Sequence, residues 1–96
     1  MSRVDDEEIL KERGTRYGPM EPMWMTIGKI QWANFMFLMS KCSDAGRDPT
    51  DSEMAHLACM NMEAVKMVRS IYDPTYEDNF VDGRNYWTIA ERVSND

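Results

Sequence analysis

The clearest pattern along the chain is an apolar stripe with helical spacing over residues 50–72. Apolar residues recur there every three or four positions, which places them on one face of an α-helix. Thr50 and Glu53 have the spacing of a capping box, in which each side chain bonds the backbone N–H of the other at the start of a helix. Asp73-Pro74 marks the expected end. The predicted core face consists of Met54, Leu57, Ala58, Asn61, Ala64, Val65, Val68 and Ile71 or Tyr72.

A second helix is predicted from Met23 to about Ser43, where one apolar stripe is interrupted by Asn34. Further apolar residues lie on the other faces of this helix. A helix that is apolar nearly all round is buried, either at the centre of a domain or against a second chain. We expect a homodimer, with its interface on this helix. The stripe consists of Met23, Trp24, Ile27, Ile30, Phe37 and Leu38, and the expected interface residues are Trp32, Phe35, Met36 and Met39.

Two further helices are predicted toward the ends of the chain. Residues 4–13 begin with acidic and end with basic residues, the order that complements a helix dipole. Residues 15–22 contain two X-Pro steps and are expected to form a loop. Residues 75–78 offer a second capping box, or Asp78 can cap directly, before a last helix that reaches about residue 93. Since no β-alternation competes, the sequence predicts one all-α domain over residues 1–96, a four-helix bundle.

Charge and composition narrow the class of function. Seventeen Asp and Glu against eleven Lys and Arg give a net charge of −6, which disfavours binding to the phosphate backbone of nucleic acids. The two cysteines, Cys42 and Cys59, form no CxxC pair, and the chain opens without a signal-peptide pattern. The apolar-rich residues 20–39 include Glu21 and Lys29 and are too polar to span a membrane. We therefore expect a cytoplasmic protein with reduced thiols.

One stripe of the helix over residues 50–72 carries three metal-ligand types, His56, Cys59 and Glu63. A structural zinc site needs a fourth ligand, which no second histidine or nearby cysteine supplies. We therefore favour a single histidine at a helix surface or interface. The ten methionines suit the filling of an irregular core or, alternatively, an adaptable binding surface.

The densest group of polar residues spans the turn between the last two predicted helices. Lys66 and Arg69 precede this turn, and Asp78 and Asp82 follow it, so a helical hairpin brings opposite charges close together. One interpretation is a set of ion pairs that orient the two helices. The other is a ligand site in which the aspartates hold Mg²⁺ and the two cations bind phosphate.

Three short motifs resemble a family of small uncharacterised proteins that are common in bacteriophages and prophages. The motifs are Ile9-Leu10-Lys11-Glu12-Arg13-Gly14 with Tyr17-Gly18, then Lys66-x-x-Arg69, then Asp78-Asn79-Phe80-Val81-Asp82 with Tyr86. That family typically has an L-x-E-R-G-x-x-Y-G opening and a K-x-x-R and D-N-W-x-D-x-x-x-Y close. It is in turn similar to MazG-like nucleoside triphosphate pyrophosphohydrolases, which are all-α, oligomeric and Mg²⁺-dependent.

The resemblance implies a MazG-like fold with a ligand site between the last two helices. The ligand-binding residues would be Lys66, Arg69, Tyr76, Asp78, Asn79, Asp82 and Tyr86, and the Mg²⁺ ligands would be Glu63, Asp78 and Asp82. MazG-like enzymes carry an E-E-x-x-E motif on one core helix and E-x-x-D on the next. Here the first motif is reduced to Glu63 and the second to Asn79-x-x-Asp82. We therefore assign no catalytic residue, and any remaining activity would be Mg²⁺-dependent hydrolysis of a nucleoside triphosphate.

Two functions follow from the sequence. The first is a small acidic phage-type protein that binds a nucleotide or another phosphorylated ligand in the cytoplasm of a bacterial host. The alternative is a phage-encoded inhibitor that binds a host enzyme or an antiviral defence complex, because an acidic protein with surplus aromatic residues can compete for basic grooves. A structural component that simply oligomerises is a third interpretation.

Overall fold

The structure is a computed structural model that describes residues 7–9, 11 and 20–95. Its long helices are α2 (Met20–Ala45), α3 (Asp51–Tyr72) and α4 (Glu77–Ser94). Residues 7–9 and 11 are also helical, whereas the rest of the predicted helix over 4–13 and the Tyr17-Gly18 motif lie outside the described residues. The described residues contain no strand, so the predicted all-α class is confirmed for them.

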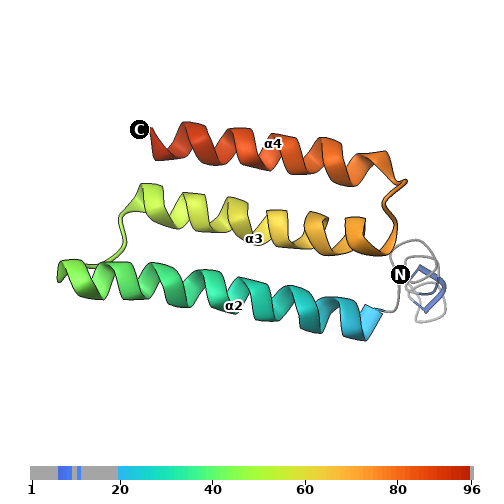
Figure 1. Cartoon of the computed structure of the whole chain (residues 1–96), viewed down its shortest axis with the longest axis horizontal. Coiled ribbons are helices and arrows are strands. Elements are labelled where there is room, and N and C mark those ends of the chain that lie inside the picture. The colour runs from blue at the N-terminus through green and yellow to red at the C-terminus, as the bar shows by residue number, and fades with distance from the viewer. Residues whose placement is uncertain (1–6, 10, 12–19, 96) are drawn as a thin grey trace.

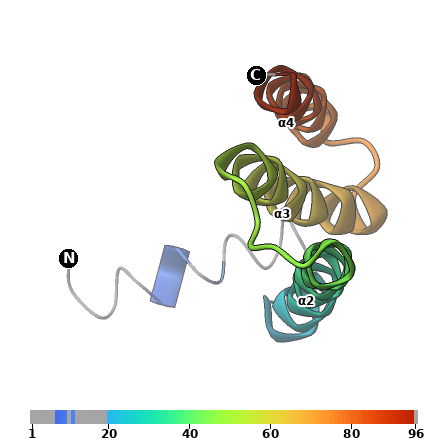
Figure 2. The ribbon, with the colours of Figure 1, turned by 90° about the vertical axis from the view of Figure 1, so that its left-hand side faces the viewer.

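The three long helices lie side by side in one layer with α3 in the middle (Figure 1). Seen along the helices, α2 and α4 flank α3 on opposite sides (Figure 2). The main packing contacts accordingly join α3 to α2 and α3 to α4. In its described part, the predicted helical bundle therefore takes the form of an open layer.

The start of α2 differs from the prediction. The helix begins at Met20, so Glu21 and Pro22 belong to its first turn instead of a preceding loop. Proline is tolerated in a first turn because the backbone N–H that it lacks would have no helical partner there. The Pro22 carbonyl accepts a hydrogen bond from the Thr26 hydroxyl at 2.9 Å, which joins this turn to the next.

The end of α2 directs the chain back toward α3. Gly46 has a positive φ of 67°, a conformation that glycine adopts without steric cost. Its N–H donates to the Ser43 carbonyl at 3.0 Å, and the Arg47 N–H donates to the Cys42 carbonyl at 3.0 Å. These two bonds form a Schellman motif, which satisfies the last carbonyls of the helix.

The start of α3 agrees with the sequence. The Glu53 N–H donates to the Thr50 hydroxyl at 3.1 Å, and the Thr50 N–H donates to the Glu53 carboxylate at 2.9 Å, so the predicted capping box is confirmed. The second candidate capping box does not form at α4. The Thr75 hydroxyl instead donates to the Asp73 carboxylate at 2.7 Å, and the side chain of the cap residue Tyr76 makes no hydrogen bond that caps the helix.

The core is small because α3 divides its side chains between two neighbours. Toward α2, Val65 and Val68 pack with Met23 and Ile27. A single buried face was expected, but α3 is also buried on its opposite side, where it meets α4. The expected core residues Met54 and Ala58 are exposed, as are both alternatives for the last core position, Ile71 and Tyr72, whereas Cys59 is buried. The buried residues outside this cluster are small or polar: Cys42, Cys59, Ala64, Asn79 and Ala90.

The cysteines and the hydropathy of the helices complete the description of the fold. Cys42 and Cys59 are both buried and form no disulfide. No helix among the described residues is sufficiently long and apolar to cross a membrane.

Candidate functional site

The turn between α3 and α4 contains one of the predicted charge pairs. Lys66 Nζ lies 2.9 Å from Asp82 Oδ2 and forms an ion pair between the two helices. The Lys66 side chain is largely buried, and the Asp82 side chain is more exposed. This contact matches the structural interpretation, in which opposite charges orient neighbouring helices. The carboxylate that was expected to bind a metal ion therefore already binds a cation of the protein.

The other two residues of the predicted charge cluster point elsewhere. The Arg69 guanidinium lies over the Trp24 ring of α2, with its central carbon 5.7 Å from the ring centroid. The Tyr76 hydroxyl donates to Asp78 Oδ2 at 3.0 Å on the exposed surface. The structure thus joins Lys66 to Asp82, and it places the Arg69 guanidinium beside Trp24 of α2 and the Asp78 carboxylate beside Tyr76.

Glu63 lies one turn before Lys66 on α3, against Gly83 of α4. A Cβ atom at position 83 would lie 3.5 Å from Glu63 Oε1, so the absence of a side chain there leaves room for the carboxylate. Oε1 is buried and has no hydrogen-bond partner, and burial raises the pKa of this carboxyl. The side-chain amide nitrogen of Asn79 is likewise buried without a partner. The α3–α4 contact therefore includes buried polar atoms that form no hydrogen bond.

The predicted metal ligands do not come together. In the part of the chain that the structure describes, no three His, Cys, Asp or Glu side chains form a group that could hold a metal ion. Glu63, Asp78 and Asp82 are therefore not a preformed Mg²⁺ site, because Asp78 bonds Tyr76 while Glu63 faces Gly83.

The structure has a pocket that the sequence did not predict, between α2 and α3. It has a volume of about 290 Å³. Its position is near the opposite end of α3 from the Lys66–Asp82 pair. Asn34, which interrupts the apolar stripe of α2, was the sequence signal that could have indicated it. The lining residues are Asn34, Phe37, Leu38, Lys41, Glu53, His56, Leu57 and Met60.

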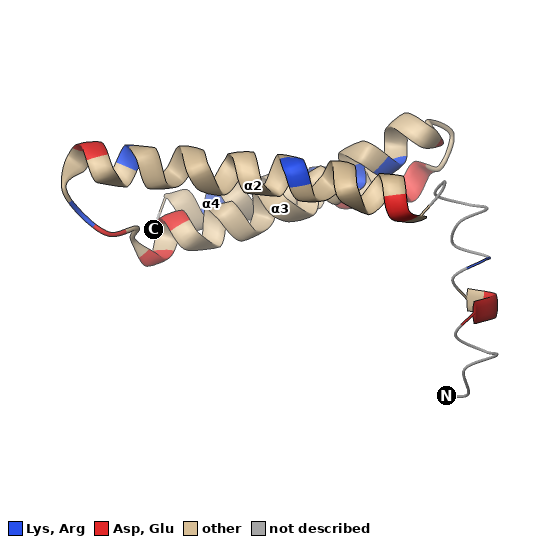
Figure 3. Ribbon diagram, turned by 90° about the horizontal axis from the view of Figure 1, so that it is seen from below, with Lys and Arg blue, Asp and Glu red and all other residues tan. Residues whose placement is uncertain are grey.

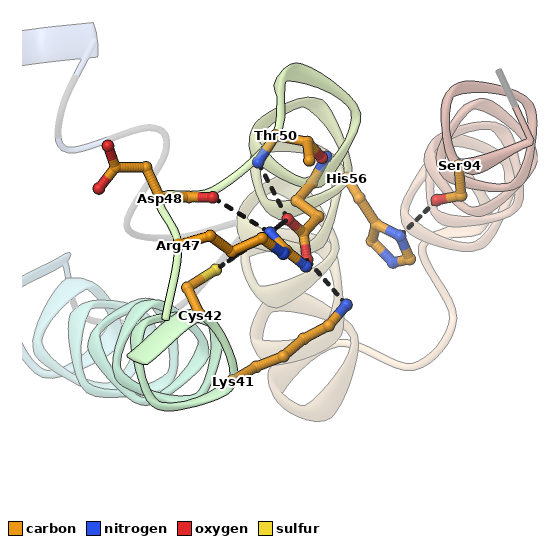
Figure 4. Close-up of polar contacts among 8 residues, drawn as sticks. Lys41, Cys42, Arg47, Asp48, Thr50, His56 and Ser94 are labelled. Carbon is orange, nitrogen blue, oxygen red and sulfur yellow. Dashed lines mark hydrogen bonds and ion pairs between the residues drawn. The ribbon is translucent and has the colours of Figure 1, made fainter. Parts of the chain in front are cut away.

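The polar end of this pocket is organised around Glu53, whose partners Arg47, Lys41 and Thr50 are labelled in Figure 4. Arg47 donates to both carboxylate oxygens, at 2.6 and 3.2 Å, and Lys41 Nζ lies 2.8 Å from Oε2. These bonds and the Thr50 N–H hold the pKa of the Glu53 carboxyl well below its usual range. One residue thus caps α3 and also ties the end of α2 and the following loop to it.

His56 joins α3 to α4 at the edge of the pocket. Its Nδ1 lies 2.6 Å from the Ser94 hydroxyl of α4 (Figure 4). This placement agrees with the favoured interpretation of a histidine at a helix interface. His56, Cys59 and Glu63 form no zinc group in the described residues.

The expected dimer interface on α2 is largely exposed to solvent. We call Trp32, Phe35, Met36 and Met39 the outer edge. The Trp32 and Phe35 rings have centroids 5.7 Å apart and planes inclined by 31°. Both rings and Met36 are exposed, whereas Met39 is half-buried. The charged residues of α2 are Glu21, Lys29, Lys41 and Asp44. Most of the α2 ribbon is therefore tan, the colour of residues without charge, in Figure 3.

Comparisons of this chain with known protein families, with curated proteins and with solved structures find no match.

Proposed function

We propose that this protein acts by binding another protein through the outer edge of α2. The observation that carries the proposal is the adjacent pair of exposed rings, Trp32 and Phe35, next to the exposed Met36. Aromatic residues and methionine are enriched at the centres of protein interfaces, and a tryptophan there commonly supplies much of the binding energy. The predicted ligand cluster, by contrast, is largely occupied by contacts within the chain.

The charge of the protein narrows the class of partner. A chain with a net charge of −6 is attracted to a partner whose apolar groove has a basic rim. Together with the resemblance to phage proteins, this charge supports an inhibitor of a host enzyme or of an antiviral defence complex in the bacterial cytoplasm. No nucleic acid is part of this proposal.

The test compares two tryptophans with almost the same exposure on different surfaces. Trp32→Gln removes the centre of the outer edge, and Trp87→Gln on α4 is the matched control. The wild-type protein and the control should capture the same host protein from bacterial lysate, and Trp32→Gln should lose it. The captured protein, once purified, should then bind with an affinity that falls as salt rises. Equal capture by both variants, or a purified pair that does not bind, would contradict the proposal.

A second candidate is the binding of a nucleotide or another phosphorylated ligand by a MazG-like homodimer. The observation in its favour is the pair of buried polar atoms without hydrogen bonds, Glu63 Oε1 and the Asn79 amide nitrogen, near Lys66. A ligand phosphate could compete with Asp82 for Lys66 and would bring its own Mg²⁺, since Mg²⁺ needs only one or two protein carboxylates when phosphates complete its shell.

Calorimetric titration tests this second candidate. Nucleoside triphosphates and cyclic dinucleotides, each with and without Mg²⁺, should bind the wild-type protein. Lys66→Met should weaken that binding, while Lys29→Met on α2 should leave it unchanged. The absence of heat in every titration would eliminate this function.

A further inference from the structure

One broad side of the helical layer carries three parallel rows of residues spaced by seven. Seven residues make nearly two turns of an α-helix, so the members of a row point to the same side. Ile71 lies four residues after the end of the α3 row and extends it. We call the rows together with Ile71 the broad face. The rows are Met23, Ile30 and Phe37 on α2, Glu53, Met60 and Met67 on α3, and Phe80, Trp87 and Ser94 on α4.

Contacts between the helices place the three rows on one side of the layer. Phe37 and Met60 line the same pocket, which joins the rows of α2 and α3. His56 also lines that pocket, and it bonds Ser94 at 2.6 Å, which brings the α4 row to the same side. The broad face therefore crosses all three helices and includes the pocket.

Five large apolar residues of the broad face are exposed to solvent. Their exposed fractions are 79% for Phe37, 75% for Ile71, 62% for Trp87, 48% for Met67 and 44% for Phe80. At about 200 Å² for a full side chain of this size, these fractions amount to about 600 Å² of apolar surface. The largest apolar patch on a typical monomer is about 300–600 Å², whereas each partner of a stable complex buries about 800 Å². These five residues alone provide most of that area.

We infer that a second copy of this chain covers the broad face. The charged residues at this spacing gather at one end of the face: Glu53, whose carboxylate is already bound by Arg47 and Lys41, and Asp44, the next residue of the α2 row after Phe37. A twofold axis across the middle of the face therefore places the carboxylates of the two copies at opposite ends, so two copies with a net charge of −6 can meet there.

The dimer would be a sandwich of two helical layers. A twofold axis brings the same patch of each copy together, so every apolar row gains a partner and the pocket becomes part of the contact. The outer edge of α2 lies on a different surface and remains accessible. The inference therefore does not rest on the proposed function, and it moves the homodimer predicted from the sequence from the outer edge to the broad face.

Two tryptophans of equal exposure distinguish these surfaces. Trp87 on the broad face is 62% exposed and Trp32 on the outer edge is 63% exposed. The wild-type protein should sediment as a dimer. Trp87→Gln should raise the dimer dissociation constant at least about tenfold, the usual effect of losing a central tryptophan, and Trp32→Gln should leave it unchanged. Far-UV circular dichroism should show full helix content in both variants.

A second pair of variants tests whether the weaker dimer is specific to the Trp87 position or a property of the whole broad face. Phe37 and Met36 are neighbours in sequence but lie on the broad face and the outer edge respectively. Phe37→Gln should also weaken the dimer, and Met36→Gln should not. The inference is overturned if the wild-type protein is monomeric at about 100 µM. An interface of this size would have a lower dissociation constant than that. Dissociation by the two outer-edge variants and not by the two broad-face variants overturns it equally.

Discussion

At the scale of single residues, Glu63 and Glu53 are two carboxylates in opposite environments. Glu53 accepts hydrogen bonds from Arg47 and the Thr50 N–H, which favour its charged form. Glu63 has a buried oxygen without a hydrogen-bond partner, which favours its neutral form. The two residues therefore affect the stability of the fold with opposite dependence on pH.

Replacement of Glu63 by glutamine should stabilise the protein at neutral pH. Because the pKa of Glu63 is raised in the folded state, its favourable contribution is complete below the unfolded value of about 4.3 and is lost as the pH rises through the folded value. Glu63→Gln should thus have a higher melting temperature than the wild type at pH 7, and the gap should shrink toward pH 4. A gap that is independent of pH would show that the charge of Glu63 has no part in it.

Replacement of Glu53 should have the reverse pH dependence. The pKa of Glu53 is lowered by Arg47, so its contribution is complete above about pH 4.3 and is lost as the pH falls below that value. Glu53→Gln should melt at a lower temperature than the wild type at pH 7, and the two should converge at strongly acidic pH. Asp51→Asn, which removes a neighbouring charge from the same helical turn, serves as the control in the same melting series.

The sequence predicted Glu53 better than Glu63 because its role is local. A capping box is a spacing of three residues, which can be found in any sequence, and the sequence gives no comparable sign of the bond from Arg47. The environment of Glu63 depends on Gly83, which belongs to another helix. Whether the two residues face each other depends on how each helix is rotated about its axis, and the spacing of residues within one helix does not determine this.

At the scale of elements, prediction succeeded where helices have strong ends. α3 was predicted to begin after Thr50 and end before Asp73, as it does, because a capping box and an Asp-Pro step mark these ends. α2 begins earlier than predicted because Pro22 lies in its first turn, where a helix tolerates proline. The buried faces of α3 were predicted only in part, since the number of helices that pack against it is a tertiary property.

Replacement of Gly83 by alanine should measure the space beside Glu63. Alanine favours a helix interior over glycine by about 1 kcal/mol, and a Cβ at position 83 meets Glu63 Oε1 at ordinary contact distance. Gly28→Ala on α2 is the matched control, because a Cβ there has no neighbour within 4 Å. Urea unfolding should show both variants stabilised, with a smaller gain for Gly83→Ala at pH 7 because its methyl group further dehydrates the Glu63 carboxylate. An equal gain at pH 7 and pH 4 would contradict this account.

At the scale of the whole molecule, the layer leaves large side chains exposed on more than one surface. The sequence indicated that α2 is apolar nearly all round and that a partner would cover it. It did not indicate the broad face, because that surface exists only when rows from three helices lie on one side. The placement of the predicted ligand residues is likewise a tertiary property: Lys66 and Arg69 share one helix but point toward different neighbours.

If two layers associate through the broad face, thermal stability should depend on protein concentration. A dimer that dissociates as it unfolds melts at a higher temperature when it is more concentrated. The wild-type melting temperature should therefore rise over a hundredfold increase in concentration, and that of Trp87→Gln should stay nearly constant. Calorimetric scans at several concentrations would show this, and a constant wild-type value would argue for an independent monomer.

The position of α3 between its two neighbours also bears on how the chain folds. Each main contact joins helices that follow one another directly, across the short connections 46–50 and 73–76. Contacts between neighbours in sequence require little loop closure, so this topology belongs to the fast-folding class. α3 can act as a template on which α2 and α4 assemble in either order.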